Sequence, residues 1–178
     1  MVVKIYWGEE VCISEQEILK EVWSVVAEDE VVEGHVLILL LKKRFSVSMS
    51  TIREALGLKD PHKGSHTLFL LIFKKLSPIQ ELKDTKLLNA WGQCHYCLWK
   101  AGIHHHDVSC RDLMYYRVND KVVGMLNGYD LASLASRHNP LGNKQTGTML
   151  FMAINLLATD SQDGEVEHLY HHDMESFI

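Results

Sequence analysis

The segment at residues 98–132 constrains the fold of this chain more than any other part, because polar residues alternate there with short apolar elements. A predicted helix ends at Gly102, and the polar loop that follows carries Asp107 and Asp112. Two short strands then meet at a turn formed by residues 119–120, and the second strand leads into residues 128–130. This order brings the carboxylates of the loop close to residues 128–130.

Composition narrows the class of protein. At 178 residues the chain is one domain or part of a larger one, and 47% hydrophobic and 23% charged residues indicate an ordered globular fold. A net charge of −5 argues against nucleic acid as a partner. The longest apolar run, residues 36–41, is far shorter than the ~20 residues that cross a bilayer, and residues 1–7 do not resemble a signal peptide. We therefore expect no membrane partner, an intracellular location (cytoplasmic or nuclear) and reduced cysteines.

The first elements predict an ion pair. Residues 2–7 alternate apolar and polar side chains, as in a half-buried strand. Ser14 and Glu17 form a capping box at the start of a helix that runs to about Ala27. Glu15 has the spacing of the apolar face of this helix, and an inward carboxylate requires a cation, for which Lys4 is nearest in sequence. The alternatives are Glu17 as the partner of Lys4, or a solvated lysine beside a surface glutamate.

Further elements follow from the same patterns. Residues 34–41 and 67–73 are predicted to be buried strands, and residues 50–56 a short helix in a polar insert. Residues 87–102 have the apolar spacing of a helix whose tryptophans belong to the core. Residues 59–64 and 133–145 carry the Gly, Pro and Asn that are typical of loops.

Four motifs in order resemble one family. The run His105-His106-Asp107, with Asp112 five residues later, resembles the kinase sequence H-R-D-x-x-x-x-N, and residues 128–132 resemble D-Y-D-L-A. Residues 146–153 are similar to T-G-T-x-x-F-M-A, and residues 168–177 to H-x-Y-R-H-D-L-E-S-F. The chain therefore resembles the fungal-type protein kinases over almost its whole length.

This resemblance implies an α+β, protein-kinase-like fold that is truncated at both ends. A partial β-rich N-lobe with an insert would occupy residues 1–73, a hinge residues 74–77, and the first part of a helical C-lobe residues 78–178. The glycine-rich strand pair that covers the phosphates would precede Lys4, and the sequence begins after it.

The resemblance also implies ATP and Mg²⁺ as cofactors and phosphoryl transfer to protein Ser/Thr hydroxyls, with substrate and protein partner unknown. It implies that Asp107 is the catalytic base and that Lys4 and Glu15 position the phosphates. Lys74, Lys75 and Leu76 would line the adenine site, and Asp112 and Asp130 would bind the metal. Thr148 and Asp173 would have structural roles. We expect Asp173 to bind the backbone of His105 and His106, or else to be the N-cap of its own helix.

Departures from the family pattern predict impaired catalysis. Gly128 stands where the family has a metal-binding aspartate, and Asp112 stands where it has an asparagine. Asp130 follows one position after the motif's tyrosine and is expected to point elsewhere. Losing the ligand at Gly128 removes about 4 kcal/mol of transition-state stabilisation, or about a thousandfold in rate. His106 replaces the arginine that contacts a phosphorylated loop.

Two alternatives to an active kinase therefore stay open. One is a pseudokinase or protein-interaction module without phosphoryl transfer. The other is a zinc-binding module, because three cysteines and four histidines fall within seventeen positions and Cys94 and Cys97 have C-x₂-C spacing. The seven candidate ligands are Cys94, His95, Cys97, His104, His105, His106 and Cys110.

Overall fold

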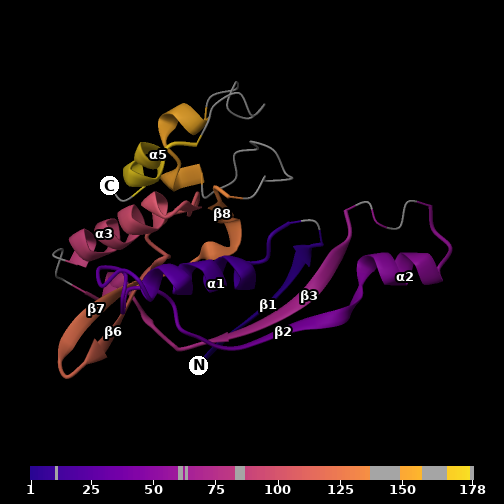
Figure 1. Ribbon diagram of the computed structural model, residues 1–178, viewed down its shortest axis with the longest axis horizontal. Helices are drawn as coiled ribbons and strands as arrows, with labels where there is room; N and C mark the ends of the chain where they lie inside the picture. The colour runs from indigo at the N-terminus through magenta and orange to yellow at the C-terminus, as the bar shows by residue number, and fades with distance from the viewer. Residues whose placement is uncertain are drawn as a thin grey trace.

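The chain folds as α+β, with small antiparallel sheets and helices on their faces (Figure 1). The computed structural model describes residues 1–10, 12–59, 62, 64–82, 87–136, 149–157 and 168–176. The predicted loops at 59–64 and 133–145 lie largely outside these ranges.

The first sheet has the order β1-β3-β2 (Figure 1). It consists of β1 (Val2–Glu9), β2 (Leu39–Ser48) and β3 (His66–Phe73), and all its pairings are antiparallel. In β3, every second side chain is buried, as the period of two in a strand requires when one face is covered. Lys4 lies opposite Leu71 in the register, so it points to the covered face. The predicted strands near residues 2–7 and 67–73 are confirmed.

Helix α1 (Glu15–Val26) covers that face. The Ser14 backbone N–H and hydroxyl donate to the Glu17 carboxylate at 3.0 and 2.7 Å, which completes the predicted capping box. Ile18, Leu19 and Val22 are at most 1% exposed and pack into the same core as β3. The predicted helix is therefore confirmed.

The strand predicted at residues 34–41 is wrong in its bounds. Val36 and Leu37 are buried but lie outside the sheet, and Val36 makes only an isolated bridge to Leu126. Strand β2 begins at Leu39 and continues to Ser48 through a polar stretch. An edge strand with one solvated side tolerates such polar residues. A prediction based only on apolar runs therefore placed the strand too early in the sequence. The short helix was predicted nearly correctly: α2 (Met49–Ala55) follows Ser48, whose hydroxyl accepts from the Thr51 N–H.

A hairpin and a long helix form the second half of the core. Strands β6 (Leu113–Val118) and β7 (Lys121–Leu126) join through Asn119 and Asp120, with φ of 48° and 64°, as a type I′ turn requires. Helix α3 (Leu87–Lys100) packs against β7. Trp91 is fully buried there, as its spacing predicted.

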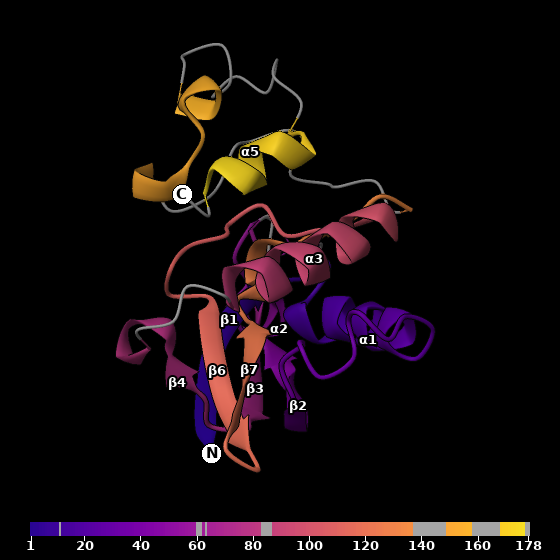
Figure 2. The same ribbon diagram turned by 90° about the vertical axis from the view of Figure 1, so that its left-hand side faces the viewer.

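Short elements complete the fold. Strand β4 (Ser77–Pro78) pairs with β6, and β5 (Ile103–His104) pairs with β8 (Ser133–Leu134). Helix α5 (Tyr170–Glu175) lies against α3, on the side away from the hairpin (Figure 2). The described residues also form the 3₁₀ helices η1 (Ile79–Glu81), η2 (Tyr129–Leu131), η3 (Met149–Phe151) and η4 (Ile154–Leu157).

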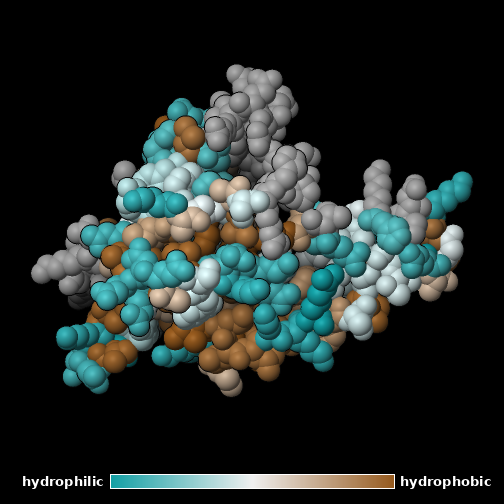
Figure 3. Space-filling model, in the orientation of Figure 1, coloured by the Kyte–Doolittle hydropathy of each residue, from teal (hydrophilic) through white to brown (hydrophobic). Residues whose placement is uncertain are grey.

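The surface retains an apolar area. Val3, Ile5 and Trp7 point away from the covered face of the sheet and are 51–62% exposed. In Figure 3, apolar side chains gather below α1, near the start of the first sheet. All four cysteines are free thiols in this structure. Within the described ranges, no helix has the length and apolarity needed to span a membrane.

Two glycines test the packing of α3 on β7. A Cβ at Gly124 would lie 2.7 Å from Cε2 of Trp91, whereas a Cβ at Gly92, on α3, would meet no atom within 4 Å. We expect Gly124→Ala to lower the free energy of unfolding by about 1–3 kcal/mol through overpacking. The matched control Gly92→Ala should raise it by about 0.5–1 kcal/mol, since alanine favours helix. Urea unfolding measures both, and an unchanged Gly124→Ala midpoint would contradict the close approach.

Candidate functional site

Lys4 is the centre of an ion-pair cluster between the sheet and α1. Its Nζ lies 2.8 Å from Oε2 of Glu15, whose side chain is 1% exposed, so the predicted pair is present. Burial raises the pKa of the Glu15 carboxyl, and Lys4 opposes this shift. Burial alone would lower the pKa of Lys4, but the carboxylates of Glu15 and Asp130 outweigh burial and raise it. The two carboxylates thus favour the ammonium form of Lys4, whereas the pKa of Glu15 stays above its usual value.

Asp130 belongs to the same cluster. Its Oδ1 lies 3.1 Å from Lys4 Nζ, and its side chain is 48% exposed. It is carried by η2, which packs against α1. Tyr129 in the same turn is 1% exposed and anchors it in the core. The sequence predicted that Asp130 points away from the metal position, but the motif held no signal that it would pair with Lys4.

Asp112 occupies the space beside Gly128. The backbone of Gly128 has φ of +85°, and an ideal Cβ there would lie 2.9 Å from Cγ of Asp112 and still nearer to its Oδ1. A side chain at position 128 therefore collides with the Asp112 carboxylate in its observed position. Only glycine meets both the backbone requirement and this steric one.

Asp112 is engaged by its own loop. Its Oδ2 accepts from the backbone N–H of Ser109 at 3.0 Å and from the Ser109 hydroxyl at 2.6 Å. Burial raises the pKa of Asp112, the Ser109 bonds and His105 lower it, and Asp107 raises it. The charge of Asp107 thus acts on the Asp112 carboxyl.

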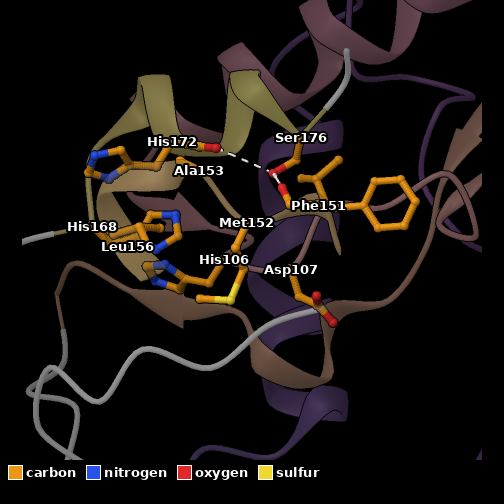
Figure 4. A pocket seen from close by; sticks show the side chains of 10 residues that line it. His106, Asp107, Phe151, Met152, Ala153, Leu156, His168, His172 and Ser176 are labelled. Atoms are coloured by element: carbon orange, nitrogen blue, oxygen red, sulfur yellow. Dashed lines mark hydrogen bonds between the residues drawn. The ribbon is translucent and has the colours of Figure 1, made fainter. Parts of the chain in front are cut away.

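The loop with Asp107 is tied to the segment that follows β7. A carbonyl oxygen only accepts, so the 2.8 Å contact between His105 Nε2 and Asn127 O means that Nε2–H of His105 donates. The His105 ring also packs against Tyr129, with ring centroids 5.1 Å apart. Asp107 is half-buried and borders a small pocket with His106 and Met152. In Figure 4 its carboxylate points away from the histidines of that pocket.

A second buried carboxylate, Asp173, supports this loop from the opposite side. Its side chain is 1% exposed and accepts from Nε2–H of His95 at 2.8 Å and of His168 at 2.6 Å. It also accepts from the His106 backbone N–H at 3.3 Å, in a residue with φ of +66°. These bonds hold the pKa of Asp173 far below its usual value despite burial.

The expected contact of Asp173 with the His106 backbone is therefore confirmed. The N-cap alternative is wrong, because Leu169 is the N-cap of α5. The roles of His95 and His168 as its partners were missed. The available signal for His95 was its place beside Cys94 on the buried face of the predicted helix.

A comparison with family models gives a match over the second part of the chain. The model described as fungal protein kinase matches residues 71–178, which is more than half of the chain. The chain belongs to the fungal protein kinase family. None of the curated proteins compared with it matches. Asp107, Asp112, Asp130 and Asp173 lie inside the matched range, whereas the ion pair of Lys4 with Glu15 lies outside it and rests on the geometry alone.

The remaining predicted residues of this fungal protein kinase family member are placed as follows. Leu76 is 8% exposed and belongs to the core, whereas Lys74 and Lys75 are exposed. The Lys74 ammonium lies 4.7 Å from the centroid of the Tyr116 ring. Their assignment to an adenine site stays a prediction. Thr148 lies outside the described residues.

The cysteine and histidine cluster has no arrangement of metal ligands in the described part of the chain, where no three His, Cys, Asp or Glu side chains are grouped as a metal site requires. Cys94 is buried, and burial raises the pKa of its thiol to about 12. Its Sγ lies 3.9 Å from the carbonyl of His35. A zinc ligand must be a thiolate, which this environment disfavours.

Gly128 and Asp112 can be tested as a pair. Alanine at Gly128 meets both a left-handed backbone, which costs about 1–2 kcal/mol, and the Asp112 carboxylate. The control Gly57→Ala meets only the first cost, because φ is +66° and no atom lies within 4 Å of its Cβ. We expect Gly128→Ala to lower the free energy of unfolding by more than Gly57→Ala in urea titrations. Adding Asp112→Ala should recover part of the difference, and strict additivity would contradict the collision.

His106 predicts a pH dependence. Burial lowers its pKa to about 3, and the neighbouring His168 adds to this shift. Between about pH 6.5 and pH 3 the unfolded chain therefore binds a proton that the folded chain excludes, so the free energy of unfolding falls as pH falls. His106→Asn keeps a residue that tolerates the positive φ and should flatten this slope between about pH 6.5 and 4.5. Chemical denaturation at several pH values measures it, and an equal slope in both proteins would contradict the assignment.

Proposed function

We propose that the chain forms a protein-kinase-like nucleotide cleft in which Lys4 contacts the phosphates of ATP. Residues 1–73 would form a partial N-lobe, residues 74–77 the hinge, and residues 78–178 the beginning of the C-lobe. The observation that carries the proposal is the ion pair of Lys4 with the buried Glu15 at 2.8 Å. It joins the two residues that the resemblance assigns to phosphate positioning.

Continuity between the two halves of the cleft supports this proposal. Lys4 contacts Asp130, and Asp130 lies two residues after Gly128. Gly128 adjoins the Asp112 carboxylate. The proposed phosphate-binding lysine is thus connected through Asp130 and Gly128 to Asp112, on which the charge of the proposed catalytic base acts.

The carboxylates do not fit the family's magnesium site. Gly128 supplies no side-chain oxygen, Oδ2 of Asp112 is held by two donors of Ser109, and Asp130 is paired with Lys4. Mg²⁺ requires several oxygen ligands in near-octahedral geometry. We therefore propose nucleotide binding with impaired phosphoryl transfer, in which Asp107 keeps the position of a base but lacks a well-held metal nearby.

A second candidate is a pseudokinase that binds another protein, which the exposed Val3, Ile5 and Trp7 favour. The zinc alternative has no comparable support, and metal analysis of untagged protein tests it: stoichiometric zinc would replace the present proposal.

Nucleotide binding can be tested by thermal shift and calorimetry with ATP, with and without Mg²⁺. We expect ATP to raise the melting temperature, and Lys4→Met to weaken binding by about ten- to a hundredfold through loss of a charge-assisted contact. Lys42→Met, which removes an exposed lysine from β2, is the matched control and should bind like the parent. Equal ATP affinity in the Lys4 and Lys42 variants would contradict the cleft.

The impairment needs a separate assay. Transfer of the γ-phosphate to generic Ser/Thr substrates should be at background, and Asp107→Asn should leave this background unchanged. Turnover that Asp107→Asn abolishes would show an active kinase instead.

A further inference from the structure

The two carboxylates around Lys4 differ in their exposure. Glu15 is 1% exposed and lies on the inner side of the ammonium, whereas Asp130 is 48% exposed and the Lys4 side chain is 33% exposed. The Tyr6 ring covers a further side, with its centroid 5.4 Å from Nζ. An anion that approaches from solvent therefore meets Lys4 from the direction of Asp130.

The charges add to this obstruction. Lys4 carries one positive charge and lies within 3.1 Å of two carboxylates, so the three side chains sum to −1. A phosphate oxygen that contacts Nζ would repel the Asp130 carboxylate at close range, because like charges this near cost free energy even in a partly solvated site.

The geometry points to Asp130 as a built-in competitor for the phosphate position on Lys4. This inference rests on the proposed nucleotide cleft and specifies how this chain regulates it: an incoming polyphosphate must first displace Asp130. The displacement needs only a side-chain rotation. Tyr129, the preceding residue, is 1% exposed and fixes the turn, while the Asp130 side chain is half-exposed. Asp130 thus lowers the affinity of the Lys4 site for a free polyphosphate and is a specificity-determining residue in this sense.

The test compares the parent chain, Asp130→Asn and Asp120→Asn. Asp120 lies at the exposed tip of the β6–β7 hairpin with φ of +64°, a conformation that asparagine tolerates, so its variant has the same change in net charge away from Lys4. Metal-free ATP and inorganic tripolyphosphate are the two probes, titrated by calorimetry. We expect Asp130→Asn to bind both about tenfold tighter than the parent and Asp120→Asn.

The outcomes separate the inference from the proposed function. Tripolyphosphate binding that is tighter in Asp130→Asn, but not in Asp120→Asn, supports Asp130 as the competitor. If ATP then binds no more tightly than tripolyphosphate, the proposed nucleotide cleft is contradicted, but the role of Asp130 is not. Equal affinities of all three proteins for both probes, or an equal gain in Asp120→Asn, overturn the competitor. Acylation of the Lys4 amine by an amine-reactive reagent, read by peptide mass spectrometry, should also be faster in Asp130→Asn, and an unchanged rate overturns the proposed contact.

Discussion

The buried carboxylate of Glu15 is the constraint on which the first half of the structure depends. It lies at 2% exposure in the apolar face of α1, where an unpaired charge would cost several kcal/mol. Its partner, Lys4, comes from β1, and the pairing of Lys4 with Leu71 turns the lysine toward α1. A one-residue slip of β1 would send this cation to the outer face, so the ion pair and the strand register require each other.

Asp173 has the corresponding role in the second half. Its carboxylate joins α3, α5 and the loop at His106 through three hydrogen bonds, and the contact with the His106 N–H supports a backbone with positive φ. Asp173 thus positions the loop of the candidate site from outside it, whereas Glu15 positions Lys4 from within it.

The parts that the sequence predicted correctly depend on local patterns. The capping box at Ser14, the inward spacing of Glu15 and the two-residue turn at Asn119 each involve only a few neighbouring residues. The bounds of β2 were wrong because an edge strand accepts polar residues that a central strand excludes. The contact of Asp130 with Lys4 depends on how η2 packs against α1, and no motif encodes that distance.

Gly128 and Asp112 are best understood as one structural change. The resemblance to fungal protein kinases places a carboxylate at 128 and an amide at 112, and this chain has the carboxylate at 112 and no side chain at 128. Because residue 128 lacks a Cβ, the Asp112 carboxylate can lie against its backbone, while Ser109 holds Oδ2. The negative charge is thus kept in the proposed cleft, but one oxygen of the Asp112 carboxylate is bound by the Ser109 loop. A return to aspartate at 128 alone would then meet a steric collision before it could supply a ligand, so the two positions must change together.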